Sequence, residues 1–278
     1  MAEAFTIENE DIAPELLGEF NSLQIMVTGD IHWPLPPSNR SLGGNQVHVW
    51  AANLDLLPEA LGRCRSALSQ EELQRADRFH FETHRNRFMA GRGILRTLLA
   101  TYLECAPDKL NFSYGPNGKP ALADELSQSG LFFNLAHSDD LALIAVTRLG
   151  PIGVDVERIR PMPDSDELVE RFFSVRESAL FQKLPDEQKN LAFFNLWTRK
   201  EAWLKATGEG IGDLLNQVEV TFLPGEPAQF LSLPQNSGLT NDWTLRRLEP
   251  ASSFVGAVAS RNLQFSISHF RFSIDQFP

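Results

Sequence analysis

The stretch GPIGVDVERIRP, residues 150–161, decides the fold because it sets two acids inside an apolar run bounded by turn residues. Side chains of a β-strand alternate between its two faces. Asp155 and Glu157 would therefore share one face, while Val154 and Val156 would point to the other. Two carboxylates on one face repel each other, so either they face water or a positive charge lies between them.

The overall composition is that of a globular chain. It has 278 residues, of which 42% are hydrophobic and 22% charged, which suits one large domain or two ordinary ones with a sizeable core. The formal net charge of -11 argues against a general binder of nucleic acid or of anionic membranes, since such proteins need an extended cationic surface. We expect neither partner, and an anionic ligand would have to meet a local basic pocket.

Cysteine usage and the N-terminal sequence bear on location. The two cysteines, Cys64 and Cys105, form no CxxC pair and have no zinc-site spacing, which favours a reduced setting. Residues 1–20 carry acids where a signal peptide has a basic start and an apolar core, and no later run is long enough to span a membrane. These features predict a cytoplasmic protein.

The chain divides into an extension and two halves. Residues 30–45, DIHWPLPPSNRSLGGN, are rich in Pro, Gly, Ser and Asn, so we expect residues 1–44 to be an extension, poorly ordered in part. The remaining chain divides into an N-terminal half, residues 45–148, and a C-terminal half, residues 149–278. Two similar halves would supply an interface within one chain, so we expect a monomer.

Each half shows the same order of elements. Apolar spacing predicts a long helix at residues 83–104, and a second at 185–210 that Pro185 opens and Gly208 or Gly210 closes. Alternating strands follow each helix. This pattern predicts an α+β fold of two similar halves, a pseudo-twofold duplication in which each long helix packs on an antiparallel sheet and the active site lies at the interface.

The second long helix carries a further acid and a lysine. Glu201 and Lys205 are four residues apart and share one helix face. Taken alone, this pair reads as a solvent-facing ion pair, and the two strand acids read as a solvated strand face. Together, two strand carboxylates and one helix carboxylate form the oxygen-only set that a hard divalent cation requires, and Mg²⁺ fits best. Lys205, one turn beyond the helix acid, would reach a phosphate bound to that ion.

Several ordered motifs then match a known family. The segments GPNGKPAL, FNLAHS, GVDVERIRP, FFSVRE and FNLWTRKEAWLKATGEGI resemble the pattern of the Sfp-type 4′-phosphopantetheinyl transferases over about residues 46–272. The resemblance implies an enzyme that moves the phosphopantetheine arm of coenzyme A onto a serine of an apo acyl or peptidyl carrier protein, releasing adenosine 3′,5′-bisphosphate.

The resemblance also implies roles for the residues of these motifs. Asp155, Glu157 and Glu201 would be the ligands of Mg²⁺, or of Mn²⁺ in its place. Glu201 would be the base that accepts the serine proton, or would hold the water that does so. Coenzyme A, the co-substrate, would be held by Arg75, Arg87, Lys119, Pro120, His137, Lys200 and Lys205.

The basic residues of the first long helix are candidates for the 3′-phosphate of coenzyme A. Between residues 83 and 103 there is no acid, whereas the segment carries His84, Arg85, Arg87, Arg92 and Arg96. The alternative is a solubilising helix face, since arginine stems also cover apolar surface. A lysine that some relatives place on the preceding helix corresponds to Glu72 here, so that phosphate contact is either absent or supplied by a neighbour such as Arg75 or Arg78.

Two further features, His137 and the segment 171–184, each have two interpretations. His137 is assigned to the 3′-phosphate, and the alternative is a structural histidine satisfied by Asp139 or Asp140. The segment RFFSVRESALFQKL, residues 171–184, offers aromatic and basic side chains to a carrier protein, but such aromatics are more often core residues. Two other functions stay open: an inactive module that binds coenzyme A or a carrier, and a metal-dependent phosphodiesterase.

Overall fold

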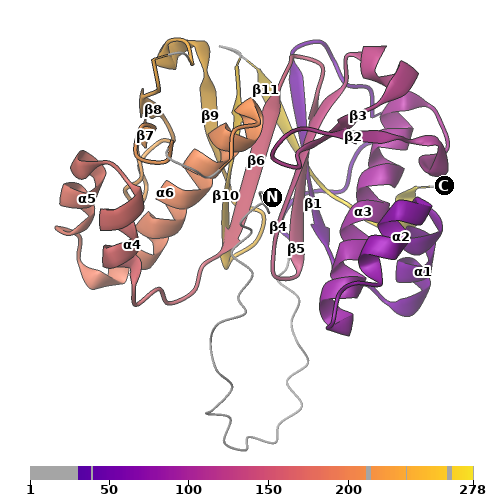
Figure 1. The fold of residues 1–278 in the computed structure, drawn as a ribbon, viewed down its shortest axis with the longest axis horizontal. Coiled ribbons are helices and arrows are strands. Elements are labelled where there is room, and N and C mark those ends of the chain that lie inside the picture. The colour runs from indigo at the N-terminus through magenta and orange to yellow at the C-terminus, as the bar shows by residue number, and fades with distance from the viewer. Residues whose placement is uncertain (1–30, 39, 211–213, 236, 262–264, 278) are drawn as a thin grey trace, which may run out of the picture.

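Two β-sheets lie between two long helices (Figure 1). The computed structural model describes residues 31–38, 40–210, 214–235, 237–261 and 265–277. The layers run helix, sheet, sheet and helix, with α3 outside one sheet and α6 outside the other (Figure 1). The structure is therefore of the α+β class that the sequence predicts.

The N-terminal part builds most of one sheet and the helix that covers it. Its elements are β1 (Gln46–Asn53), α1 (Pro58–Ser66), α2 (Gln70–Ala76), α3 (Glu82–Leu103), η1 (Pro107–Lys109), β2 (Phe112–Tyr114), β3 (Pro120–Leu122), η2 (Asp124–Ser129), β4 (Phe132–Ser138) and β5 (Leu141–Thr147). Ser69 begins α2 with a capping box, because its side chain accepts from the Glu72 N–H while the Glu72 carboxylate accepts from the Ser69 N–H. The helix therefore begins directly after Ser69.

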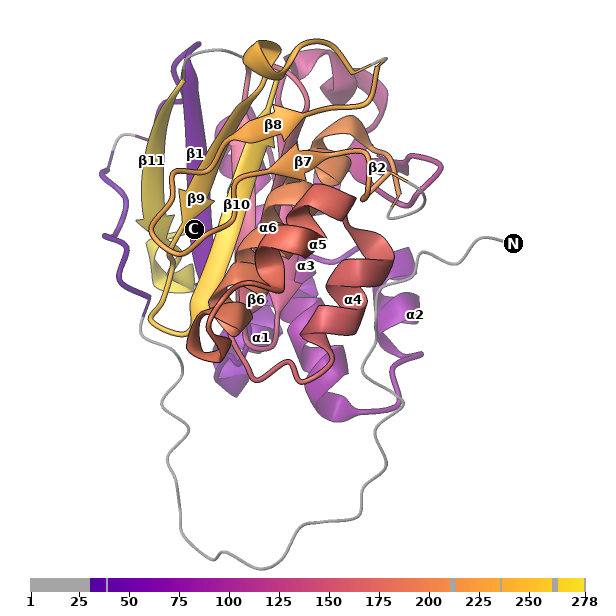
Figure 2. The same cartoon turned by 90° about the vertical axis from the view of Figure 1, so that its left-hand side faces the viewer.

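The C-terminal part builds the second sheet. Its elements are β6 (Ile152–Arg158), α4 (Ser165–Phe172), α5 (Val175–Phe181), α6 (Asp186–Thr207), β7 (Glu219–Val220), β8 (Phe230–Ser232), η3 (Thr240–Asp242), β9 (Thr244–Leu248), β10 (Phe254–Ser260), β11 (Ser266–Arg271) and η4 (Ile274–Gln276). Pro185 and Gly208 bound α6 as predicted, and Gly208 ends it in the left-handed conformation with φ 79°. The helices α4 and α5 lie outside α6 (Figure 2).

The two sheets repeat one order of strands. In the first sheet β1 pairs with β5 and β5 with β4, all antiparallel. In the second sheet β6 pairs with β10 and β10 with β9, again antiparallel. Each set reads strand, long helix and then hairpin along the chain.

The last strand departs from this order. β11 pairs with β1, in parallel, so residues near the C-terminus complete the first sheet. This corrects one expectation, because the first sheet is not purely antiparallel. The pairing satisfies the free edge of β1, whose backbone N–H and C=O groups would otherwise be open to another chain.

Three clusters of buried apolar side chains lie between the four layers of helices and sheets. Trp50 and Leu98 belong to the cluster between α3 and the first sheet. Trp203 and Ala257 belong to the cluster between α6 and the second sheet. Val154, fully buried, belongs to a third cluster that joins the two sheets. The strand β6 thus turns its valines toward the first sheet.

Only part of the predicted extension is described. Residues 31–38 and 40–44 form no helix or strand, as expected, but they contact the body of the protein. The Trp33 indole N–H donates to the Glu249 carbonyl (3.0 Å), and its ring stacks on His269 at 4.7 Å between centroids. Residues 1–30 lie outside the described residues.

The helices of the described part were compared with what a membrane span requires. None of them is both long enough and apolar enough to cross a bilayer.

Candidate active site

The acids and the lysine predicted from the motifs meet where α6 crosses β6. The contact is close because β6 has Gly153 at the crossing: a Cβ there would lie 2.0 Å from the Ala202 carbonyl oxygen and 2.3 Å from the Ala206 nitrogen. Only glycine lets the helix backbone approach the strand this far. Two residues on, Asp155 therefore faces the same helix.

An ion pair joins the strand to the helix. The Lys205 Nζ donates to the Asp155 Oδ1 at 2.6 Å, and the side chain of Asp155 is only 6% exposed. Glu157, which follows on the same strand face, accepts a 2.7 Å hydrogen bond from the Ser138 hydroxyl and lies 3.7 Å from the Arg160 guanidinium. The structure thus brings the two strand acids and the lysine together.

Glu201 completes the group on α6. It is 4% exposed, and its pKa is raised to about 7, first because burial disfavours the charged form and then because Asp155 and Glu157 repel it; Lys205 acts in the opposite direction. Burial followed by the charge of Asp155 likewise raises the pKa of Glu157 to about 7. Lys205, together with the Arg160 guanidinium beside Glu157, does not balance the charges of three neighbouring carboxylates.

Two carboxylate oxygens carry this imbalance most clearly. Asp155 Oδ2 and Glu201 Oε1 are buried and have no hydrogen-bond partner among the described residues. Buried polar atoms without partners are rare and call for a missing group. Within the same described residues, no group of three or more acidic, histidine or cysteine side chains is arranged closely enough to hold a metal ion, and these three acids are no exception. The chemistry of the donors suits Mg²⁺, while the Lys205 ammonium occupies one Asp155 oxygen.

His137 and Arg87 lie at the margin of this group. Desolvation, followed by the positive charges of Lys205 and Arg87, lowers the pKa of His137. The two aspartates suggested as its structural partners bind elsewhere, since Asp139 and Asp140 both pair with Arg158. The cations around the imidazole are what an anionic ligand would need.

Arg87 itself is held by an acid. Its Nε and Nη2 donate to the two carboxylate oxygens of Asp55 at 2.7 and 2.8 Å, and the arginine side chain is 23% exposed. Arg75, on α2, is exposed beside the ring of Phe88, and Pro120 is half-buried at the start of β3. The nucleotide roles of these three residues stay predictions.

Two other arginines of α3 do not face a ligand. Arg92 and Arg96 are buried, and both bind the buried carboxylate of Glu72, at 2.6 and 2.5 Å. This corrects the expectation that they could serve the 3′-phosphate. It also explains why Glu72 is an acid: α2 docks on α3 through it.

Two of the predicted lysines have other partners. Lys200 is fully buried, donates to the Glu177 Oε2 and to the Leu215 carbonyl at 2.6 Å each, and lies over the ring of Phe173. Lys119 donates to backbone carbonyls of β6 and α6. Both ammonium groups therefore bind acceptors of the protein itself, and the coenzyme A roles of Lys119 and Lys200 stay predictions.

Sequence reasoning did not assign two polar residues that hold β6. Ser138 ends β4 and binds Glu157, and the Asn134 Oδ1 accepts a 2.8 Å hydrogen bond from the Val154 N–H. Both lie in the FNLAHS motif. Their positions four residues apart put them on the same face of the strand, which is the signal that could have identified them.

The segment 171–184 is mainly part of the core. Phe173 is 5% exposed and Phe181 is fully buried, whereas Leu180 is 40% and Val175 88% exposed. The core interpretation therefore holds for the two phenylalanines, and only part of the segment is open to a partner.

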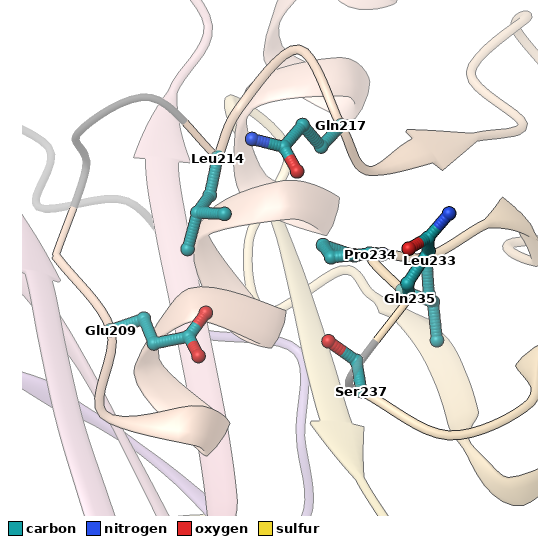
Figure 3. Close-up of a pocket in the computed structure, with 7 residues that line it drawn as sticks. All are labelled: Glu209, Leu214, Gln217, Leu233, Pro234, Gln235 and Ser237. Atoms are coloured by element: carbon teal, nitrogen blue, oxygen red, sulfur yellow. The ribbon is translucent and has the colours of Figure 1, made fainter.

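A separate pocket of about 550 Å³ lies beside the loop that follows α6. Figure 3 shows Glu209, Leu214 and Gln217 on one side of it and residues of the segment 233–237 on the other. None of the acids at the α6–β6 crossing lines this pocket, so its size alone does not make it the catalytic site.

Comparison with known proteins follows the two parts of the chain. Residues 151–259 match a model of the 4′-phosphopantetheinyl transferase superfamily, and residues 57–149 match a model of the N-terminal region of 4′-phosphopantetheinyl transferases. The 4′-phosphopantetheinyl transferase HetI of Nostoc sp. is 45% identical over 227 residues, which cover 82% of this chain and 92% of HetI. The chain belongs to the 4′-phosphopantetheinyl transferase family.

Other relatives of this transferase carry related names. A putative 4′-phosphopantetheinyl transferase of Synechocystis sp. is 43% identical over 72% of this chain and 78% of its own. Sfp of Bacillus subtilis is 31% identical over 57% of this chain and 68% of Sfp. The crystal structure of Helicobacter pylori holo-[acyl-carrier-protein] synthase in complex with coenzyme A matches 39% of this chain and 96% of that one, with 22% identity and a TM-score of 0.27. The family resemblance of the motifs is confirmed, and this transferase is an enzyme that transfers phosphopantetheine to carrier proteins.

Proposed function

We propose that this transferase takes the phosphopantetheine arm from coenzyme A and uses Mg²⁺ held by Asp155, Glu157 and Glu201. The observation that carries the proposal is the pair of buried, unpartnered oxygens, Asp155 Oδ2 and Glu201 Oε1, in a group of three carboxyl side chains. Carboxylate oxygens that lack donors in a desolvated site suit a hard cation. When bound, Mg²⁺ would neutralise the pyrophosphate and the charge that develops on the leaving phosphate. Mn²⁺ offers the same charge and a similar preference for oxygen.

The proposed reaction exchanges one phosphoester oxygen for another. The hydroxyl oxygen of a carrier serine forms a bond to the phosphorus that bears the pantetheine. The bond from that phosphorus to the bridging oxygen of the pyrophosphate breaks. The electron pair leaves with adenosine 3′,5′-bisphosphate, and the serine proton passes to a base.

Glu201 is the residue we assign to that proton, either directly or through a water that it holds. Burial and the neighbouring carboxylates raise its pKa to about 7 in the metal-free protein; a bound Mg²⁺ would lower that pKa again, which would keep the carboxylate ionised and able to accept the proton. Its place on a buried part of α6 keeps its carboxyl group oriented toward β6.

Positive groups around the acids would bind the phosphates. Lys205 is 31% exposed, so its ammonium can exchange Asp155 for a pyrophosphate oxygen at the surface of the site. His137 and Arg87 lie near enough for their charges to interact with one another, and we assign the 3′-phosphate to them. We also assign Arg75 and Pro120 to contacts with the nucleotide of coenzyme A.

The arrangement of the halves supports an active site between them. Asp155 and Glu201 come from the second strand–helix–hairpin set, whereas Ser138, His137 and Arg87 come from the first. The repeated strand order of the two sets is what a pseudo-twofold duplication with halves at 45–148 and 149–278 would produce, with β11 exchanged into the first sheet. We further propose a cytoplasmic monomer that acts on apo acyl or peptidyl carriers.

A single assay tests the proposal. Purified protein, Mg²⁺ and coenzyme A are mixed with an apo carrier protein, and intact-mass spectrometry follows the gain of one phosphopantetheine group. We expect the gain with the wild type and its loss when Mg²⁺ is chelated or when Asp155→Asn is used. Transfer that is unchanged under chelation and in Asp155→Asn would reject the metal assignment.

A further inference from the structure

The side chain of Lys119 ends among backbone carbonyls rather than at the site predicted for it. Its Nζ donates to the Ile152 oxygen at 3.0 Å, to the Ala206 oxygen at 3.3 Å, and to the Lys205 oxygen. A lysine ammonium has three donors and no acceptor. All three are used, so none is left for a phosphate.

Two of these acceptors belong to the C-terminal end of α6. The last four carbonyls of a helix lack partners within it, and the helix dipole makes that end negative. Lys119 supplies a positive charge and two hydrogen bonds to it. Asn117, from the same β2–β3 turn, adds a 2.9 Å bond from its Nδ2 to the Gly208 carbonyl.

The third acceptor belongs to β6. Ile152 comes directly before Gly153, the residue at which the α6 backbone touches the strand. One ammonium group therefore binds both elements that carry the acidic site, at the place where they are closest. It does so from the turn between β2 and β3, which belongs to the other half of the chain.

We propose that Lys119 is a positioning residue, assisted by Asn117, which fixes α6 against β6 so that Glu201 and Lys205 meet Asp155 in register. The inference rests on the proposed function for its effect on the reaction. It differs from a nucleotide-binding role, because Lys119 acts through the helix end and not on coenzyme A. Burial of the ammonium, which lowers its pKa to about 8, fits a group enclosed between two elements.

The test compares Lys119→Met and Asn117→Ala with a matched control, Lys109→Met. Lys109 is 75% exposed on η1, where it is 3.6 Å from Asp108. Hydrogen–deuterium exchange of the ligand-free protein is measured on peptides that cover residues 200–208. Steady-state transfer to an apo carrier gives kcat and the KM for coenzyme A.

We expect hydrogen–deuterium exchange in the last turn of α6 to be roughly tenfold faster in Lys119→Met, because the substitution removes charged hydrogen bonds from the helix end. We also expect kcat to fall about tenfold while the KM for coenzyme A stays within about twofold. Asn117→Ala should change both in the same direction by less, and Lys109→Met should change neither.

Three outcomes would overturn the proposal. A higher KM with unchanged kcat and unchanged exchange would make Lys119 a nucleotide ligand. Faster exchange with unchanged kinetics would make it a helix cap without influence on the site. Unchanged exchange in Lys119→Met would show that Lys119 does not stabilise the C-terminal end of α6. If Lys119→Met does not fold, Asn117→Ala, whose side chain is exposed, is judged by the same changes in exchange, kcat and KM. A wild type that transfers nothing from coenzyme A rejects the proposed function, whereas hydrogen–deuterium exchange still tests whether Lys119 caps α6.

Discussion

Two clusters of buried charge, one beside each long helix, are balanced in opposite ways. Beside α3, the carboxylate of Glu72 faces two arginines, Arg92 and Arg96, and its oxygens accept from both. Beside α6, three carboxyl groups lie near Lys205 and Arg160, and oxygens of Asp155 and Glu201 have no hydrogen-bond partner among the described residues. The first cluster is satisfied by the protein alone, whereas the second is not.

The same contrast appears in the proton affinities. Desolvation raises the pKa of Glu72, but the arginines and the Ser69 N–H outweigh it, so its pKa lies below the usual value. The pKa of Glu201 rises to about 7 because nothing outweighs burial and repulsion there. A cluster that the fold balances serves stability, and a cluster that the fold leaves unbalanced is a candidate for ligand binding and catalysis.

Glu201→Gln should give the largest effect, and in activity rather than stability. We expect kcat/KM for transfer to fall on the order of a thousandfold, because a base and a metal ligand are lost together. The melting temperature should stay level or rise, since a buried carboxyl group without a full set of partners is removed. Glu187→Gln, at the exposed start of the same helix, is the control. A destabilised variant with near-normal activity would make Glu201 a structural acid.

Glu72→Gln should show the reverse pattern. Removing one partner of a buried ion cluster costs about 3 to 5 kcal/mol of unfolding free energy, here because Arg92 and Arg96 keep their charges. Urea titration measures the loss, and kcat per folded molecule should change little. Glu71→Gln, exposed on the same helix turn, is the comparison. If Glu72→Gln costs less than about 1 kcal/mol, the cluster does not stabilise α2 on α3.

His48 offers a smaller, pH-dependent test in the balanced half. The Tyr102 hydroxyl accepts from the Trp50 indole N–H at 2.9 Å and shares a 2.7 Å hydrogen bond with the His48 Nδ1. Burial lowers the pKa of His48 from 6.5 to about 4. The folded protein then binds fewer protons than the unfolded chain between these values. The contribution of His48 to the unfolding free energy, up to roughly 3 kcal/mol, is fully present above pH 6.5 and is lost as the pH falls toward 4.

Replacing this histidine should flatten the curve. Urea unfolding of His48→Gln from pH 7 to pH 4 is expected to show a shallower decline than the wild type, whereas His84→Gln, exposed on α3, should follow the wild type. Equal slopes for His48→Gln and the wild type would mean that the ring is protonated in the folded protein.

The sequence predicted elements and motifs better than it predicted partners. The alternation around Asp155 correctly separates an acidic face of β6 from an apolar one, because strand geometry imposes a period of two, and residues of both faces are buried. Ser69 and Gly208 mark helix ends, because capping depends on local chemistry. Such features need only neighbouring residues.

Charged side chains were less predictable because their partners are distant in the chain. Arg92 and Arg96 form a basic stripe that would suit a phosphate as well as a carboxylate, and nothing local shows that Glu72, about twenty residues earlier, takes both. Lys119 and Lys200 stand in motifs that suggest ligand contacts, yet both are directed to backbone carbonyls or a buried acid. The parallel placement of β11 also depends on an edge built more than 200 residues earlier.

Calorimetric titration of Mg²⁺ into the protein with coenzyme A present tests the central claim most directly. We predict that the wild type and Glu72→Gln bind Mg²⁺ alike, and that Asp155→Asn and Glu201→Gln lose that binding heat. Equal Mg²⁺ affinity in all four proteins would contradict the account, because the unbalanced acids beside α6 would then not be the metal site.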